Sequence, residues 1–272
     1  MNKIVSDCNF SPSTVNKIRS CAYAAKLSHI NRAPTLSEKH YDTRLGSKLH
    51  EALEYYIVRD QRARRGDVVD TVQIDLSKFP PVKTNLLVEG VQHFVTQIYP
   101  WYRDSDEVLC EFGISLKLHK GELRQCSGVG IHRGKIDFLA IRGMLATIID
   151  FKSLETDKNK FQLQYYVACL AAAKKNRPLT AIQAYSYVFH TKSFERVVCI
   201  SSGVEQQALR EYVATYLEDT KEILRQNRDT PTPNPMCRFC CFRVGCPAEE
   251  EANAYLTDTS GIIETDPDWC RA

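Results

Sequence analysis

The chain has 272 residues, of which 43% are hydrophobic and 25% charged, and its formal net charge is +3. This composition is that of a globular protein that buries a sizeable core. No apolar run is long enough to span a bilayer, and the first residues lack the apolar stretch of a secretory signal. The sequence therefore excludes a membrane protein, and we expect a cytoplasmic one.

The charge is unevenly distributed along the chain. From Glu249 onward seven acidic residues stand against one arginine, so the residues before Glu249 carry a net charge of +9. A basic body suits a polyanionic partner such as DNA. A solvated surface of mixed charge would give the same totals, and charge alone favours that interpretation.

The first part of the sequence predicts helices. Ser11 or Ser13 can cap the first helix, Pro12 suits its first turn, and Pro100 ends the last one. The charged stretch 59–67 is interpreted as a loop or a frayed helix end, and the proline-containing stretch 78–83 as a linker. The predicted helices cover residues 11–28, 42–60 and 85–99.

The pattern then changes to β-structure and returns to an alternation of helices and strands. Glycine-containing turns separate three β-rich segments at 107–118, 131–141 and 145–152, which predicts an antiparallel meander. A helix at 158–175, strands at 179–189 and 194–201, and a long helix at 204–228 follow. This order predicts an α/β fold with a mixed central sheet flanked by helices.

Two buried-looking acids lie in the apolar strands of residues 134–153. They are Asp137 and Asp150, and Lys152 follows the second of them by two positions. Residues i and i+2 of a strand point to the same face, so Asp150 and Lys152 project together. If the two strands pair through the Gly143 turn, Asp137 joins them from the neighbouring strand.

Two carboxylates held close together repel each other unless a cation lies between them. Oxygen ligands suit Mg²⁺ or Mn²⁺, and such an ion can bind a phosphate oxygen and lower the pKa of a bound water. Lys152 would then position or deprotonate that water and stabilise negative charge. An Asp–Lys pair on an exposed strand edge is the alternative, but Ile148, Ile149 and Phe151 indicate a buried strand.

Four more residues fit the same site. Glu111 lies at the start of the preceding β segment, and His50 lies beside the apolar stripe of the second helix. Gln162 and Tyr166 are spaced i, i+4 and so share one face of the helix that follows the site. Each has an ordinary structural interpretation when it is taken alone, as a core or surface residue.

Together these residues resemble the RecB-like branch of the PD-(D/E)xK nucleases. The family pattern is a helical His, G-x-x-D, D/E-x-K and Q-x-x-x-Y, and this chain has His50, Gly134 to Asp137, Asp150 to Lys152, and Gln162 to Tyr166 in that order. The resemblance implies a restriction-endonuclease-like sheet, with His50, Asp137, Asp150 and the Phe151 carbonyl as metal ligands. It also implies that Lys152 is catalytic, that Gln162 and Tyr166 organise the site, and that Glu111 is a less regular acid of the family.

The cysteines indicate a second inorganic centre. The chain has 11 cysteines, and Cys237, Cys240 and Cys246 form a C-x₂-C-x₅-C pattern. Closely spaced thiolates in a cytosolic protein favour a soft metal or an iron–sulfur cluster, either of which usually takes four ligands. Cys241 is one candidate for the fourth, although adjacent cysteines rarely chelate one centre well.

The chain is also similar to the iron–sulfur members of the same branch, among them the AddB nuclease domain and the CRISPR adaptation exonuclease. They carry one cysteine in a helix before the core and three after it, which here matches Cys21 with Cys237, Cys240 and Cys246. Ala22 departs from the proline that usually follows the first cysteine. The resemblance implies that a [4Fe–4S] cluster, rather than zinc, joins the N- and C-terminal segments.

These observations predict four segments. They are an N-terminal helical segment at 1–105, the nuclease core at 106–228, a cysteine segment at 229–250, and an acidic tail at 251–272.

The leading hypothesis is a Mg²⁺- or Mn²⁺-dependent DNA nuclease, and the resemblance favours an exonuclease or a single-strand-preferring enzyme. The resemblance further implies a role in DNA recombination or in CRISPR adaptation, with a protein partner from that pathway. It also implies that the protein could be phage-encoded. Basic residues that could follow the DNA backbone, or merely form a solvated face, are Arg59, Arg62, Arg64, Arg65, Lys158 and Lys160. A non-catalytic DNA-binding module, and a redox or zinc-regulatory protein, are the alternatives.

Overall fold

A computed structural model describes two compact units. One comprises 42–213, and the other combines the chain up to Tyr41 with the chain from Ala214 onward. Residues 78–80 of the predicted linker, Cys241, and the acidic tail from 254 lie outside the described residues. Those that the structure describes are 11–27, 41–69, 81–119, 122–125, 132–152, 158–173, 179–227, 229–234, 237, 240, 242, 245–251 and 253.

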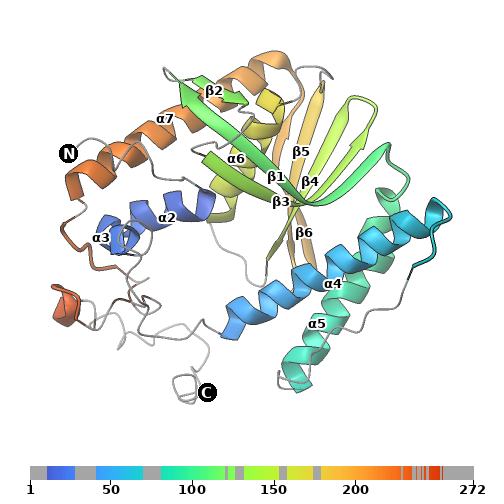
Figure 1. The fold of residues 1–272 in the computed structure, drawn as a ribbon, viewed down its shortest axis with the longest axis horizontal. Coiled ribbons are helices and arrows are strands. Elements are labelled where there is room, and N and C mark those ends of the chain that lie inside the picture. Colours follow the sequence, from blue (N-terminus) through green and yellow to red (C-terminus); the bar gives the residue numbers. More distant parts are fainter. Residues whose placement is uncertain are drawn as a thin grey trace. The chain divides into compact units, whose positions relative to one another are not determined.

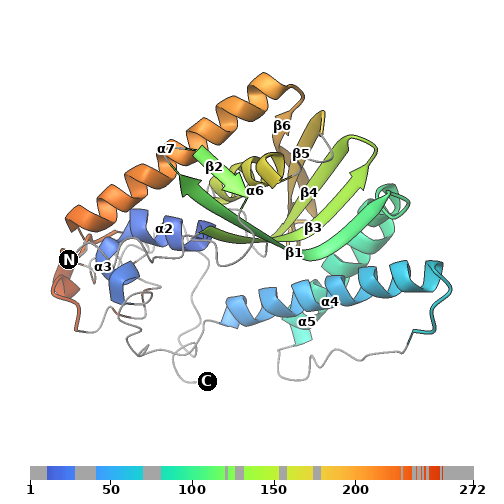
Figure 2. The ribbon, with the colours of Figure 1, turned by 45° about the horizontal axis from the view of Figure 1, so that its top comes forward.

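The unit of residues 42–213 is built on a six-stranded sheet (Figures 1 and 2). Its order is β2-β1-β3-β4-β5-β6, with β4 and β5 parallel and all other neighbours antiparallel. A parallel pair needs a crossover, and helix α6 (Lys158–Ala173) lies between its two strands in sequence. The predicted α/β fold with a mixed sheet is therefore confirmed. The strands are β1 (Glu107–His119), β2 (Glu122–Gln125), β3 (His132–Arg142), β4 (Leu145–Lys152), β5 (Ala181–Val188) and β6 (Ser193–Ile200).

The predicted hairpin at Gly143 is also present. Gly143 has a φ of 58°, a left-handed conformation that favours glycine, and its amide donates a 2.8 Å hydrogen bond to Asp106 Oδ2. The prediction of a three-strand meander missed β2, which pairs with the end of β1. With Glu122, Arg124 and Gln125 in four residues, β2 lacks the apolar alternation by which strands are recognised.

Helices cover the two faces of this sheet. On one face Phe94 packs against Phe138, Phe151 and Tyr187, with ring centroids 5.0–5.9 Å apart. Gln162 of α6 contacts Asp150, which alternates with Phe151 along β4 and so points to the other face. The helices on the Phe94 side are α4 (Tyr41–Arg64), α5 (Pro81–His93) and the short helices η2 (Phe94–Ile98) and η3 (Tyr99–Trp101).

Of two boundary predictions in this unit, the alternative of a helix end holds for the first part of the stretch 59–67, whereas the linker predicted at 78–83 extended too far. The charged stretch from Arg59 is helical through Arg64, because Arg64 forms ion pairs with Asp60 at 2.9 Å and Asp104 at 2.6 Å that support the end of α4. The predicted linker ends at Pro81, which begins α5, in keeping with the preference for proline in the first turn of a helix.

The second unit contains α2 (Pro12–Ser20), α3 (Ala22–Ala25) and the end of α7 (Gly203–Asn227). The single helix predicted at 11–28 was wrong, because Cys21 is extended, with φ −158° and ψ 103°, and separates α2 from α3. Arg19 lies 3.9 Å from the ring centroid of Tyr216, which joins α2 to α7. Among the helices that the structure describes, none combines the length and the apolarity that crossing a membrane requires.

Candidate active site

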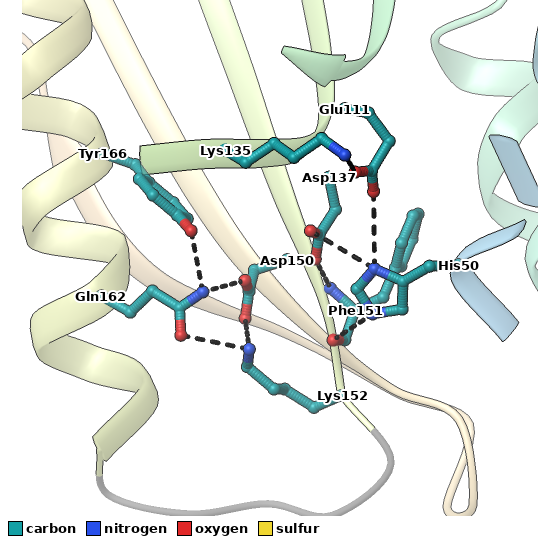
Figure 3. A network of polar contacts seen from close by, with 9 residues as sticks. All are labelled: His50, Glu111, Lys135, Asp137, Asp150, Phe151, Lys152, Gln162 and Tyr166. Carbon is teal, nitrogen blue, oxygen red and sulfur yellow. Dashed lines mark hydrogen bonds and ion pairs between the residues drawn. The ribbon is translucent and has the colours of Figure 1, made fainter. Parts of the chain in front are cut away.

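Asp137 and Asp150 come together where β3 and β4 stop pairing. The last backbone pair of the two strands is Phe138 with Ile149, so both aspartates lie one position beyond it. Asp137 Oδ2 instead accepts a 2.8 Å hydrogen bond from the backbone amide of Phe151. The antiparallel register places the two carboxylates side by side on one face, as the sequence predicted (Figure 3).

Asp150 is the centre of a polar network with α6 (Figure 3). Its side chain is fully buried, Oδ1 accepts a 2.8 Å hydrogen bond from Gln162 Nε2, and Oδ2 lies 2.9 Å from Lys152 Nζ. The amide of Gln162 also accepts a 3.1 Å hydrogen bond from Lys152 and donates one of 3.0 Å to the Tyr166 hydroxyl. Gln162 therefore fixes the carboxylate and the ammonium relative to each other.

A second group faces the other side of Asp137. His50 Nδ1 is 3.4 Å from Asp137 Oδ1 and 3.6 Å from Glu111 Oε1, and Glu111 also forms an ion pair with Lys135. The second ring nitrogen of His50, Nε2, is 3.2 Å from the carbonyl oxygen of Phe151. A helical histidine, three strand residues and a backbone carbonyl thus surround one small volume.

Burial and neighbouring charges shift the pKa values of His50 and Asp137 in opposite directions. Burial alone would lower the pKa of His50, but the hydrogen bond and negative charge of Asp137 outweigh it and raise that pKa to about 9. Burial would raise the pKa of Asp137, but His50, Lys152 and the Phe151 amide hold it below its usual value. Without another cation, His50 therefore carries a proton at neutral pH and neutralises Asp137.

Asp150 is less well compensated. Burial raises its pKa to about 7, even though the charge of Lys152 acts in the opposite direction. Lys152 would have its pKa lowered by burial, but the charges of Asp150 and Asp137 hold it above the ordinary value. The lysine therefore stays charged at neutral pH, while the Asp150 carboxylate still needs positive charge nearby.

The donor set fits a hard divalent cation. One nitrogen of His50 and one oxygen each of Glu111 and Asp137 all lie within 4.8 Å of one another. Asp150 is fully buried, and the Lys152 ammonium 2.9 Å from Oδ2 does not offset the effect of burial on its pKa, so a cation would relieve both carboxylates. Oxygen donors with one imidazole are the chemistry of Mg²⁺ and Mn²⁺ sites.

Gly134 explains one position of the sequence pattern. A Cβ added at Gly134 would lie 2.9 Å from the ring of Tyr166 and 3.1 Å from that of Tyr165. The first distance is too short for a Cβ contact, so the glycine at position 134 lets the tyrosines of α6 pack closely against β3.

The structure brings the predicted catalytic residues together but divides them differently from the prediction. The three residues that could hold an ion, called the ligand group below, are His50, Glu111 and Asp137. Both oxygens of Asp150 instead face Gln162 and Lys152. The metal roles of Asp150 and of the Phe151 carbonyl therefore stay predictions. Sequence reasoning missed Lys135, although its position two residues before Asp137 mirrors that of Lys152 two residues after Asp150.

The predicted DNA-binding residues lie in mixed surroundings. Arg62 forms an ion pair with Asp67 at 3.4 Å, and Arg64 pairs with two aspartates. Both are exposed, as are Arg59, Arg65 and Lys160. The side chain of Lys158 lies outside the described residues. Contact of these residues with DNA stays a prediction.

The four predicted cluster ligands belong to one compact unit. Cys21, Cys237, Cys240 and Cys246 are all partly exposed. The Asn234 side chain donates a 2.8 Å hydrogen bond to the Ser20 carbonyl, next to Cys21, and its backbone amide donates to Cys237 Sγ at 3.3 Å. Among the described residues, no three of these sulfurs lie within 4.8 Å of one another.

Comparison with known proteins places the chain in a family by its sequence. The crystal structure of SSO0001 aligns over 87% of this chain and 96% of its own, with 16% identity and a TM-score of 0.35, a likeness too weak to carry an argument. No curated protein matches the chain. The profile of the PD-(D/E)XK nuclease superfamily matches residues 9–247. The chain that assembles these carboxylates and Lys152 at the end of a mixed sheet therefore belongs to the PD-(D/E)XK nuclease superfamily.

Proposed function

We propose that this protein is a Mg²⁺- or Mn²⁺-dependent DNA nuclease that acts at DNA ends or on single strands. The observation that carries the proposal is that two sets of polar side chains meet at Asp137. The network of Asp150, Lys152 and Gln162 lies on one side, and the ligand group of His50 and Glu111 lies on the other. The preference for ends and single strands rests on the resemblance to iron–sulfur nucleases.

His50, Glu111, Asp137 and Asp150 would hold the ion, with the Phe151 carbonyl at the edge of the site. A bound ion supplies polarisation of a phosphate oxygen and a lowered pKa of a nearby water. In the absence of an ion, the charges of Asp150 and Asp137 raise the pKa of Lys152, so the lysine carries a proton at neutral pH. It orients the attacking water and stabilises negative charge on the phosphate, and Gln162 keeps its ammonium in place.

The first experiment compares end-labelled linear DNA with closed circular DNA, in Mn²⁺ or in EDTA, using protein purified without oxygen. The test variant is Lys152→Met. The matched control is Lys221→Met, because Lys221 is similarly covered and also pairs with a carboxylate, Glu218, at 3.0 Å. We expect loss of linear DNA that needs both Mn²⁺ and Lys152 and that Lys221→Met retains.

Other outcomes of this experiment would change the proposal. Cutting of the circle would indicate an endonuclease instead of an enzyme that acts at ends. Absence of metal-dependent cutting of both substrates would contradict nuclease activity and favour a DNA-binding module that retains the fold.

We further propose that Cys21, Cys237, Cys240 and Cys246 hold a [4Fe–4S] cluster. The contact of Asn234 with Ser20 and with Cys237 supports a link between these segments. The preference for [4Fe–4S] over zinc rests on the resemblance to iron–sulfur nucleases. Iron and sulfide analysis with visible absorption tests this, and a zinc content of one ion without sulfide would contradict it.

The pathway is proposed from resemblance as well. A nuclease with this centre would trim DNA in recombination, repair or CRISPR adaptation, together with a protein partner of that pathway. Arg59, Arg65 and Lys160, which are exposed, are the proposed contacts with the DNA backbone. A cleavage rate that does not fall as salt is added would contradict this electrostatic contribution.

A further inference from the structure

Glu111 has a backbone conformation that strands rarely contain. Its φ is 52°, in the left-handed region, where the Cβ of any residue except glycine is crowded. Cys110 pairs with Phe138 and Phe112 pairs with Ile136, but Glu111 and Asp137 between them do not pair through their backbones. Such a conformation persists only where its surroundings hold it, and it is typical of functional sites.

The side chain of Glu111 is held by two cations (Figure 3). Its side chain is only 16% exposed, Oε1 faces His50 Nδ1 at 3.6 Å, and Oε2 forms an ion pair with Lys135 Nζ. The Lys135 side chain is 63% exposed. Lys135 therefore lies at the solvent side of the ligand group, with its charge on a carboxylate that belongs to the group.

A divalent ion and the Lys135 ammonium need the same carboxylate. Like charges a few ångströms apart repel strongly where water is partly excluded, so binding of the ion between Glu111 and Asp137 weakens the Lys135 pair. The lysine has a flexible stem and an exposed end, so it can turn outward without disturbing the strand. The anion that then comes within its reach is a phosphate of the bound DNA.

We propose that Lys135 is a DNA phosphate-binding residue, and that the ion makes it available by taking Glu111 away from it. The inference rests on the proposed nuclease function. It gives the two lysines of the site separate tasks. Lys152 is fixed by Asp150 and Gln162, whereas Lys135 exchanges Glu111 for the substrate. Metal and DNA therefore strengthen each other's binding, since such coupling is reciprocal.

The test measures DNA binding rather than cleavage. The parent is the Lys152→Met variant, so that DNA stays intact, and binding of a labelled single-stranded oligonucleotide is followed by anisotropy over a range of salt in Mn²⁺ or EDTA. We expect Lys135→Ala to lower the slope of log affinity against log salt by about 0.7, the contribution of one phosphate contact on a single strand. This loss should occur in Mn²⁺ and be much smaller in EDTA.

Two further variants make the test specific. Glu111→Gln removes the carboxylate that engages Lys135, so in that background Lys135→Ala should lower affinity equally in Mn²⁺ and in EDTA. Lys135→Arg should retain the metal-dependent contribution. The matched control is Arg142→Ala, which removes an exposed cation about 23 Å along the same strand and should have no metal-dependent effect.

The outcomes separate this inference from the proposed function. If the parent binds DNA more tightly in Mn²⁺ but Lys135→Ala changes affinity equally in Mn²⁺ and EDTA, Lys135 is only a surface charge and the inference is wrong. If the parent does not bind DNA under either condition, the inference and the nuclease proposal both fail.

Discussion

The carboxylate site takes its residues mostly from neighbouring strands of one sheet, whereas the four cysteines come from segments over two hundred residues apart in sequence. In the first, strand register and the Gln162 amide hold the side chains at hydrogen-bonding distances. In the second, the Asn234 side chain joins the segments by its hydrogen bond to the Ser20 carbonyl, and no three of the described sulfurs lie within 4.8 Å of one another. The comparison suggests that folding preorganises the first site, while the second would be ordered by its inorganic centre.

Replacement of a cysteine should test this comparison with the largest effect. Cys237→Ser should remove the proposed cluster and so the crosslink between the N- and C-terminal segments. Because a crosslink over more than a hundred residues restricts the unfolded chain, its loss should destabilise the second unit by about 4 kcal/mol. The melting temperature should fall by at least roughly 10 °C. Thermal melting of oxygen-free protein measures this, with Cys199→Ser, an exposed cysteine of β6, as the control. Equal melting temperatures for the two variants would contradict the proposal that a cluster joins the N- and C-terminal segments.

Lys152→Met should have the opposite signature. Removing a donor that stabilises charge on the phosphate should lower the single-turnover rate about 10²–10³-fold. The melting temperature should fall less than in Cys237→Ser, because Asp150, whose pKa is already raised to about 7, can take up a proton when its partner is removed. Cys237→Ser, assayed well below its melting temperature, should keep most of the parent rate. A comparable loss of rate in both variants would mean that the two regions are not independent.

Metal affinity should depend on pH through His50. The pKa of the imidazole is raised to about 9 in the absence of an ion, so binding below that pH must displace a proton. Mn²⁺ affinity, measured by titration calorimetry, should rise about tenfold per pH unit between pH 7 and 9 and level off above. His50→Asn should bind more weakly, with a flatter dependence. A parent affinity that is constant over this range would show that His50 is not a ligand.

Tyr166→Phe should have the smallest effect. It removes the hydroxyl that accepts a hydrogen bond from Gln162, but Gln162 keeps its contacts with Asp150 and Lys152. One such hydrogen bond is worth about 0.5–1.5 kcal/mol, so cleavage should slow a few-fold. The control is Tyr165→Phe, the adjacent residue of α6, whose ring packs with Phe161. An equal slowing in the control would indicate a general loss of packing.

Much of the site followed from the sequence because its geometry is local. Asp150 and Lys152 share a strand face, Gln162 and Tyr166 share a helix face, and the Gly143 turn places Asp137 beside Asp150. The strand and helix periods determine the first two pairs, and one tight hairpin determines the third.

The rest depends on contacts between distant residues. The left-handed conformation of Glu111 and its pair with Lys135 join β1 to β3, and no local pattern predicts them. The break at Cys21 is equally hidden, because 11–28 has no proline or glycine after Pro12 that would end a helix. The short strand β2 exists because β1 extends far enough to pair with it.

The hydrogen bond from the Phe151 amide to Asp137 has a consequence for comparing related sequences. The carboxylate replaces the backbone acceptor that strand pairing would otherwise supply, so Asp137 completes the sheet as well as the ligand group. A descendant that lost catalysis would still need an acceptor there, whereas the Lys152 ammonium takes no part in backbone pairing and contacts the side chains of Asp150 and Gln162. Retention of the lysine is therefore the better sign of a working enzyme, and Asn is the substitution at position 137 that separates catalysis from folding.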